Sequence, residues 1–412
     1  MLAERMARVS TSPTMKVAAE AEKLKRQGID VVDFGAGEPD FPTPEPAKAA
    51  AKTAIDQNFT KYTPAAGTAD LKQAICARYK ADYGVAFTEA DTIVTAGGKQ
   101  ALYNIAMVLF NRGDEVITHA PYWPTIPEQV KLAEANPVIV QTKPEDGFAI
   151  HPEAILAAIT PRTKAVIINS PANPTGAIIS EDGLSAIADA CAKRGIWVIV
   201  DLCYEKLIYD TVPHNLVKVL TDRMRERALF AGSASKAYSM TGWRLGWILG
   251  PPEVISAANT LQGHSTSNAA SISQKAALQA LTGSQEPVTE MLNEYRTRRD
   301  TLMKWLAADP RIEVVKPAGA FYLFPRLTKL LESIGIATTA EFSQVLLDEA
   351  RVALTAGEGF DAPGFVRISY ATSLERLREG TTRIFEFVKK RERGPQRGSR
   401  SGDPERQGAV AR

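Results

Sequence analysis

Two continuous apolar runs decide the fold: Ala165-Val166-Ile167-Ile168, followed by Asn169, and Trp197-Val198-Ile199-Val200, followed by Asp201. Strands without polar alternation are typical of the interior of a parallel sheet, where both faces are covered. In such sheets ligands bind beyond the carboxyl ends of the strands. We therefore expect Asn169 and Asp201 to border a pocket.

Further β-rich runs surround this pair and alternate with helical stretches. They lie at Thr92–Thr95, Glu115–Thr118, Val138–Gln141, Leu229–Gly232 and Gly246–Leu249. This alternation predicts an α/β fold, in which a mainly parallel seven-stranded sheet lies between helices.

The pattern changes near residue 294 to a long charged helix followed by short strands, which predicts a second, smaller α+β domain. These strands are expected near Ile312–Val315, Ala320–Leu323 and Val366–Ile368. We place the large domain at 45–293 and the small domain at 1–44 together with 294–390. Residues 391–412, rich in Arg, Gly and Ser, are expected to form a disordered tail.

The composition favours a globular protein with a small-molecule partner. The 412 residues are 45% hydrophobic and 23% charged, with a formal net charge of +2. That charge favours neither nucleic acid nor an anionic membrane as a partner. The three cysteines resemble neither a disulfide framework nor a metal site, which favours the cytoplasm. No apolar stretch resembles a signal peptide or a membrane span, so we expect neither.

One lysine stands among small residues directly after a β-rich run. Lys236 lies within Gly232-Ser233-Ala234-Ser235-Lys236-Ala237, and Gly242-Trp243-Arg244 follows. A lone lysine is usually a solvated surface charge. Here the small neighbours leave room for a bulky ligand, and Arg244 supplies a planar cation suited to phosphate. Lys236 is therefore a candidate functional residue.

These two segments resemble the cofactor-lysine region of the class I aminotransferases, which have the pyridoxal 5′-phosphate (PLP) fold type I. Asn173-Pro174-Thr175-Gly176 resembles the asparagine loop of that family, and Asp201-Leu202-Cys203-Tyr204-Glu205 resembles its aspartate strand. Taken singly, such dipeptides are ordinary turns and such an aspartate often caps a helix. The common order and spacing make the resemblance specific, and it covers roughly residues 12–390.

The resemblance implies PLP as the cofactor, held by Lys236 as a Schiff base. Asp201 would keep the ring nitrogen protonated, which PLP needs to withdraw electrons. Asn173 and Tyr204 would hydrogen-bond the phenolate oxygen of the ring. When Lys236 is a free amine, burial would lower its pKa so that it acts as general base.

The cofactor phosphate needs hydrogen-bond donors, and the run Thr95-Ala96-Gly97-Gly98-Lys99-Gln100 supplies them at an expected helix N-terminus. The resemblance implies phosphate contacts from the backbone N–H groups of Gly98 and Lys99 and from the side chains of Ser233 and Arg244. Tyr62 resembles a tyrosine that reaches the phosphate of the neighbouring subunit, so a homodimer is expected. The alternative for Tyr62 is an aromatic residue on a surface loop.

The remaining site residues concern the ring face and the substrate. Trp123 resembles the aromatic that stacks on the cofactor ring, with a core tryptophan as the alternative. Arg367 resembles the arginine that binds the substrate α-carboxylate. Gly37 resembles the backbone position that closes over that carboxylate, so closure of the small domain would expel water. Lys99, Trp123 and Asn173 are also expected to contact the substrate.

Two runs carry information on specificity: Gly97-Gly98-Lys99-Gln100 and Gly319-Ala320-Phe321-Tyr322 most resemble the bacterial aspartate and prephenate aminotransferases. In that subgroup the lysine matching Lys99 can meet a distal carboxylate, so aspartate with 2-oxoglutarate is the first expected substrate pair. The chain departs from the subgroup at Pro124-Thr125-Ile126-Pro127 and at Leu202-Cys203, where Val-Ser-Tyr-Pro and Glu-Ile are usual.

Other functions stay open beside this one. Prephenate or aromatic substrates would use the same site residues, and so would a PLP-dependent lyase such as a β-eliminase. A PLP-binding regulator would need a DNA-binding module, and no basic helix-turn-helix segment precedes Met15.

Overall fold

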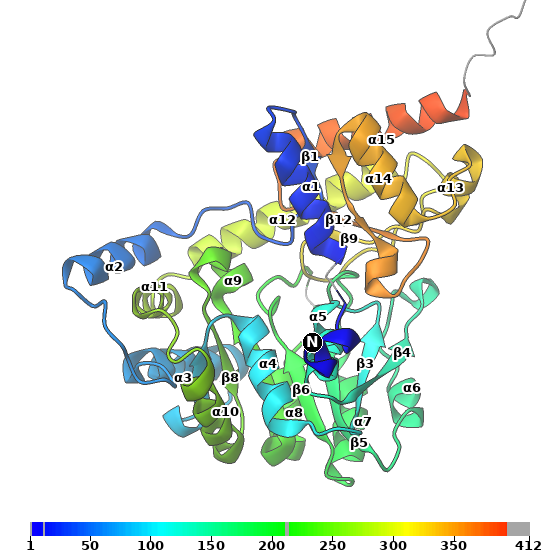
Figure 1. Ribbon diagram of the computed structural model, residues 1–412. Coiled ribbons are helices and arrows are strands. Elements are labelled where there is room, and N and C mark those ends of the chain that lie inside the picture. Colours follow the sequence, from blue (N-terminus) through cyan, green and yellow to red (C-terminus); the bar gives the residue numbers. More distant parts are fainter. Residues whose placement is uncertain (1, 11–12, 211–213, 394–412) are drawn as a thin grey trace, which may run out of the picture.

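The computed structural model describes residues 2–10, 13–210 and 214–393, with the main chain alone for residues 13–18. The expected seven-stranded sheet is present, in the order β2-β8-β7-β6-β5-β3-β4 (Figure 1). Its strands are β2 (Thr92–Thr95), β3 (Glu115–Ala120), β4 (Asn136–Gln141), β5 (Thr163–Asn169), β6 (Trp197–Asp201), β7 (Ala228–Ser233) and β8 (Gly246–Leu249). Only β8 runs antiparallel to its neighbours, so the prediction of a mainly parallel sheet is confirmed.

Helices cover both faces of this sheet. One face carries α4 (Gly98–Leu109), α5 (Thr125–Leu132) and α10 (Pro252–Ser265). The other carries α3 (Ala69–Tyr83), α6 (Pro152–Ala157), α7 (Glu181–Ala192) and α8 (Leu216–Met224). Successive strand residues point to opposite faces, so Ile167 packs into one core and Ile168 into the other. Because both faces are buried, these strands carry no polar alternation.

Three further helices belong to the larger, sheet-containing part of the molecule. They are α2 (Glu45–Asp56), α11 (Ser271–Thr282) and the short α9 (Ala234–Ala237), and α11 packs against both α2 and α3. The described residues also form six short 3-10 helices in different parts of the chain. They are η1 (Glu4–Arg8), η2 (Glu89–Asp91), η3 (Pro144–Asp146), η4 (Arg225–Arg227), η5 (Thr241–Trp243) and η6 (Gly357–Phe360).

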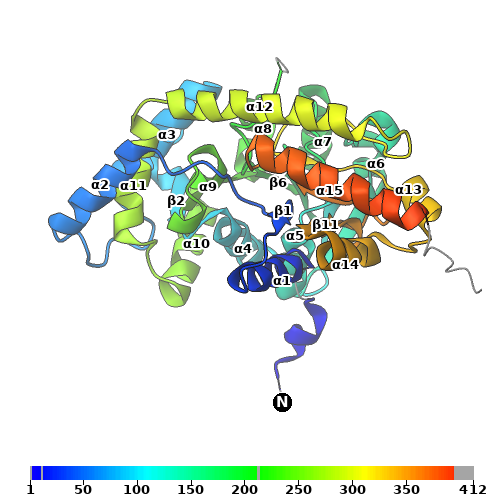
Figure 2. The same ribbon diagram turned by 90° about the horizontal axis from the view of Figure 1, so that it is seen from above.

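The two ends of the chain build the smaller unit, which has its own core (Figure 2). In it β1 (Val32–Asp33) pairs with β10 (Val352–Ala353), and β12 (Val366–Ser369) lies between β11 (Thr355–Ala356) and β9 (Tyr322–Leu323). Its helices are α1 (Pro13–Arg26), α12 (Glu286–Leu306), α13 (Thr328–Ile334), α14 (Thr339–Ala350) and α15 (Leu374–Glu392).

The expected strand at Ile312–Val315 does not form. Only an isolated bridge between Glu313 and Arg326 occurs there. Pro325 precedes Arg326 and has no backbone N–H, and Pro317 follows two residues after the predicted strand. Proline cannot donate a ladder hydrogen bond, so the pairing stops after one residue pair.

Two predicted boundaries, 293/294 and 390/391, fall within helices. The division at 293/294 lies inside α12, and the two-domain assignment stays a prediction. The helix α15 ends at Glu392, and the rest of the predicted tail, residues 394–412, lies outside the described residues. Over the part of the chain that is described, no helix is long and apolar enough to cross a membrane.

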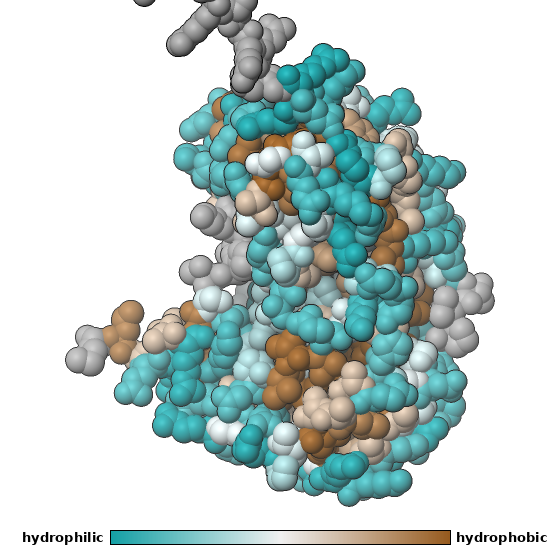
Figure 3. All heavy atoms as spheres, turned by 90° about the vertical axis from the view of Figure 1, so that its right-hand side faces the viewer, coloured by the Kyte–Doolittle hydropathy of each residue, from teal (hydrophilic) through white to brown (hydrophobic). Residues whose placement is uncertain are grey.

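The sheet has an open edge at β4, which pairs only with β3. The face seen in Figure 3 is largely hydrophilic and carries a hydrophobic area in its lower half. Within β4, Val138 and Val140 pack against the core, while Pro137 removes one backbone donor from the edge. A proline in an edge strand hinders pairing with another chain.

Candidate active site

Eleven of the twelve predicted site residues line a single cavity of about 820 Å³ at the carboxyl edge of the central sheet. They are Gly37, Gly98, Lys99, Trp123, Asn173, Asp201, Tyr204, Ser233, Lys236, Arg244 and Arg367. The cavity position follows the rule for parallel sheets, because β5, β6 and β7 all end there. The exception is Tyr62, whose side chain is 88% exposed and lies outside this cavity.

The carboxylate of Asp201 is buried at the end of β6 and lacks a cation. It is 4% exposed, and none of the described residues forms an ion pair with it. Asn169 Nδ2 donates to Asp201 Oδ2 at 3.1 Å, and the backbone N–H of Cys203 donates to Oδ1 at 3.0 Å. Burial nevertheless raises the pKa of Asp201 to about 7. A cationic ligand group beside this carboxylate would remove the cost of burying its charge.

Lys236 lies in α9, the single helical turn that follows β7. Its Nζ donates to the carbonyl oxygen of Gly37 and lies 5.8 Å from the centre of the Phe321 ring. Loss of surrounding water lowers the pKa of this amine below its ordinary value. The side chain is therefore a candidate nucleophile and base, held at the floor of the cavity.

An anion-binding arrangement lies where β2 ends and α4 begins. Gly97 has a φ of 92°, and a Cβ there would lie 2.8 Å from Arg244 Nη2. Arg244 itself is left-handed, with a φ of 53°, and its Nη1 donates to the carbonyl oxygen of Thr241 at 2.8 Å. A helix N-terminus beside a guanidinium group favours a phosphate. The neighbouring charge of Arg244 contributes, after burial, to the lowered pKa of Lys99.

Arg367 lies on β12, and one of its three guanidinium nitrogens has no hydrogen-bond partner among the described residues. Its Nη1 donates to Asn173 Oδ1 at 3.0 Å and its Nη2 to the carbonyl oxygen of Gly35 at 2.8 Å. Its Nε is buried and has no partner among the described residues. A buried donor without an acceptor is costly, so this arrangement favours an anionic ligand beside Gly37, such as a carboxylate.

Aromatic side chains complete the walls of the cavity. Lys99 Nζ lies 5.0 Å from the centre of the Trp123 ring, and the hydroxyl groups of Tyr204 and Tyr322 are 2.8 Å apart. The Arg367 guanidinium lies 4.5 Å from the centre of the Tyr322 ring. The sequence predicted no role for Tyr322, although it belongs to the Gly319–Tyr322 motif.

The sequence also placed Asn169 at the pocket without relating it to Asp201. The register of β5 and β6 pairs these two residues, and this pairing was the available signal. The predicted roles of all twelve site residues stay predictions, because neither the position of eleven of them in the cavity nor the exposure of Tyr62 tests what they do.

A buried amine, a carboxylate without an ion-pair partner among the described residues, and an anion cradle line one cavity and fit the parts of PLP. Fold and site together define a PLP enzyme of fold type I. Residues 29–384 match the family described as aminotransferase class I and II. The chain belongs to this family, and it is a PLP-dependent aminotransferase.

The similar proteins cover nearly the whole chain. An aspartate aminotransferase of Geobacillus stearothermophilus is 44% identical over 95% of this chain and 99% of its own length. An aspartate/prephenate aminotransferase of Cereibacter sphaeroides is 42% identical over 94% of this chain and 98% of its own length. The structure of a Thermus thermophilus aspartate aminotransferase with maleate has a TM-score of 0.89 and 40% identity, over 94% of this chain and 99% of that one.

Proposed function

We propose that this aminotransferase moves an amino group between L-aspartate and 2-oxoglutarate, with PLP held by Lys236. The observation that carries the proposal is the single cavity that contains the Lys236 amine, the unpaired Asp201 carboxylate and the buried, unpartnered Nε of Arg367. The names of the similar proteins support aspartate as the donor. PLP, when bound, supplies an electron-withdrawing ring that stabilises negative charge at the substrate Cα.

Eight residues of the cavity would hold that cofactor besides Lys236. Asp201 would pair with the ring nitrogen and keep it protonated, which compensates the buried carboxylate. Asn173 and Tyr204 would hydrogen-bond the ring oxygen. The face of Trp123 would cover the ring and exclude water. The phosphate would lie in the cradle formed by Gly98, Lys99, Ser233 and Arg244.

Lys236 would also move the proton. Its lowered pKa leaves a larger fraction of uncharged amine near neutral pH. In that form Lys236 Nζ would take and hold the proton from the substrate Cα. The hydrogen bond to the Gly37 carbonyl keeps the amine on the side of the cavity where Arg367 lies.

The two ends of the substrate meet different cations. The α-carboxylate, common to all amino acids, would bind Arg367 beside Gly37. The distal carboxylate of aspartate or 2-oxoglutarate would bind Lys99, which lies beside Trp123. Prephenate is the second candidate substrate, because several similar proteins are named aspartate/prephenate aminotransferases. Cys203, one of the departures from the subgroup, lines the cavity directly.

The proposal includes a homodimer with a shared site. Tyr62 lies in the loop between α2 and α3. It is one of the few large hydrophobic side chains that are exposed among the described residues. A second copy of the chain would bury it against that copy's phosphate cradle. A cytoplasmic location is supported by the cysteines, since Cys76, Cys191 and Cys203 are all free.

Reductive trapping combined with product analysis tests the proposal. Borohydride should bleach the colour of the PLP-loaded protein and fix the cofactor mass on Lys236, and Lys236→Ala should remain unlabelled. Aspartate and 2-oxoglutarate should give oxaloacetate and glutamate in equal amounts. Labelling of another lysine would overturn the assignment of Lys236, and release of ammonia in place of glutamate would indicate a lyase.

A further inference from the structure

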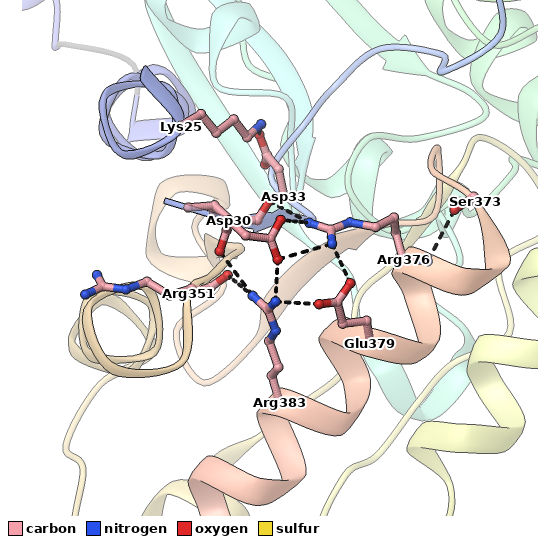
Figure 4. Close-up of polar contacts among 9 residues, drawn as sticks. Lys25, Asp30, Asp33, Arg351, Ser373, Arg376, Glu379 and Arg383 are labelled. Carbon is pink, nitrogen blue, oxygen red and sulfur yellow. Dashed lines mark hydrogen bonds and ion pairs between the residues drawn. The ribbon is translucent and has the colours of Figure 1, made fainter. Parts of the chain in front are cut away.

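A cluster of charged side chains joins the segment before β1 to α15 (Figure 4). Asp30 Oδ1 accepts a hydrogen bond from Arg376 Nη2 at 2.9 Å, and Arg383 Nη2 donates to Asp30 Oδ2. Glu379 forms ion pairs with both arginines. Arg376, Glu379 and Arg383 are three and four residues apart, so they share one face of the helix.

The two arginines also bind the main chain. Arg376 Nη2 donates to the carbonyl oxygen of Val31 at 3.0 Å. Arg383 Nη1 donates to the carbonyl oxygens of Asp30, at 3.2 Å, and of Arg351, at 3.3 Å. The contact therefore fixes backbone as well as side chains, unlike an isolated surface ion pair.

The helix and the strand also touch directly beside this cluster. A Cβ at Gly380 would lie 2.3 Å from Phe34 Cζ and 2.7 Å from Val32 Cγ1. Only glycine allows so close an approach of α15 to β1. We call this contact between α15 and the segment 30–34 the junction. It has an apolar inner side at Gly380 and a charged outer side at Asp30.

The strand side of the junction leads into the α-carboxylate site. Asp33 Oδ1 accepts from the backbone N–H of Gly35 at 2.9 Å, and Gly35 offers its carbonyl oxygen to Arg367. Asp33 also forms an ion pair with Lys25, whose Nζ lies 3.0 Å from Asp33 Oδ2, and both residues line the cavity. A shift of β1 would therefore displace one of the two acceptors that orient the Arg367 guanidinium.

The helix side of the junction leads to the same cavity. Ser373 caps α15 by accepting from the backbone N–H of Arg376 at 3.2 Å. The two residues before this cap, Ala371 and Thr372, line the cavity. Two walls of one cavity are thus joined by a single charged cluster at its outer edge.

We propose that Asp30 and Arg376 are positioning residues for the substrate α-carboxylate. Their ion pair holds β1 against α15, so that the carbonyl oxygen of Gly35 keeps Arg367 oriented into the cavity. Neither residue lines the cavity, so both act through Gly35 and Arg367. The inference rests on the proposed function, because it takes Arg367 as the carboxylate ligand.

The test uses Asp30→Asn, Arg376→Gln and the double variant in the PLP-loaded enzyme. Each single change should raise KM about fivefold for aspartate and for 2-oxoglutarate alike, since both carry an α-carboxylate. The turnover number kcat should stay within about twofold, because an interaction that is equal in ground and transition states changes KM alone. The two effects should be less than additive in the double variant, because each single change already removes the ion pair between Asp30 and Arg376.

A matched control removes another exposed ion pair far from the cavity. Asp222→Asn breaks the pair with Lys218 on α8 and should leave both KM values unchanged. Binding of maleate, a dicarboxylate that does not transaminate, is followed through the cofactor absorbance. Asp30→Asn should weaken maleate binding about fivefold, and 0.5 M NaCl should weaken it less in this variant than in the wild type, because Asp30 is 60% exposed and its pairs are screened by salt.

Unchanged KM values and unchanged maleate binding in Asp30→Asn would overturn the proposal. So would a lowered melting temperature without any change in KM, which indicates a role in stability alone. These results are distinct from failure of the proposed function. In that case the wild-type enzyme would not transaminate aspartate at all.

Discussion

The buried carboxylate of Asp201 makes a prediction about stability that does not depend on catalysis. Replacing it with asparagine in the cofactor-free protein removes a charge and keeps the size of the side chain. The carboxylate accepts from Asn169 Nδ2 and from the backbone N–H of Cys203, and the single oxygen of an amide can accept only one of these bonds. The lost hydrogen bond costs about 1–3 kcal/mol, which is less than the cost of the buried charge at alkaline pH. We therefore expect Asp201→Asn to stabilise the cofactor-free protein at alkaline pH, although it impairs the enzyme.

The magnitude follows from the pKa of Asp201, which burial raises from 3.8 to about 7. A difference of about 3 between the folded and unfolded pKa values corresponds to roughly 4 kcal/mol, at about 1.4 kcal/mol per pKa unit. Because the folded state binds the proton more tightly, this contribution to stability is present in full below about pH 4 and is lost as the pH rises to about 7. Relative to the wild type, the variant should therefore gain roughly 4 kcal/mol of stability between pH 4 and pH 8.

Urea unfolding of both cofactor-free proteins from pH 4 to pH 8 measures this difference. Asp222→Asn, an exposed carboxylate on α8, is the control and should follow the wild type at every pH. If Asp201 pairs with the protonated ring nitrogen as proposed, PLP would compensate the carboxylate, and the advantage of Asp201→Asn should disappear. Equal pH profiles for the wild type and Asp201→Asn without cofactor would refute this reasoning.

Three further predictions concern substrate, cofactor and subunit contacts. Arg367→Lys keeps the charge but loses the planar contacts of the guanidinium group. It should raise KM for every amino acid by about 10- to 100-fold, since one charge-assisted hydrogen bond is worth about 1.5–3 kcal/mol. A change in KM confined to acidic donors would contradict this. Lys99→Met should raise KM for aspartate and leave that for phenylalanine nearly constant, whereas equal losses in a donor panel would remove Lys99 as the distal carboxylate ligand. Tyr62→Phe should weaken PLP binding about tenfold in spectral titration while sedimentation still shows a dimer; unchanged PLP affinity would leave Tyr62 as a surface aromatic.

The strands of the central sheet could be predicted because their signal is local. Thr92–Thr95, Trp197–Asp201 and Gly246–Leu249 have the same bounds in the structure as in the sequence prediction. For β4 the prediction began two residues late, because Asn136-Pro137 is an unusual start for a strand. The short strands of the smaller unit depend on partners far away in the sequence. The prediction of a strand at Ile312–Val315 was wrong, because Pro325 lies beside the one residue that pairs with this segment and has no N–H to continue the pairing.

The candidate site, too, could be predicted only in part from the sequence. Residues in motifs, such as Lys236 and Asp201, could be named from the sequence because chemistry restricts the residue type. Their environment could not, since the contact of Arg367 with Gly35 joins residues 332 positions apart. The hydrogen bond between the hydroxyl groups of Tyr204 and Tyr322 is likewise a product of folding.

The pairing of β1 with β10 has a consequence for biosynthesis. Val32 leaves the ribosome 320 residues before its partner Val352, a delay of roughly 15 to 60 seconds at the usual 5–20 residues per second. The central sheet and the residues of the PLP site are complete once β8 has been made, whereas β1 and Arg367 must wait for the last part of the chain. On the proposed assignment, the residues of this chain that hold PLP are therefore all made before Arg367, the residue that the substrate α-carboxylate needs.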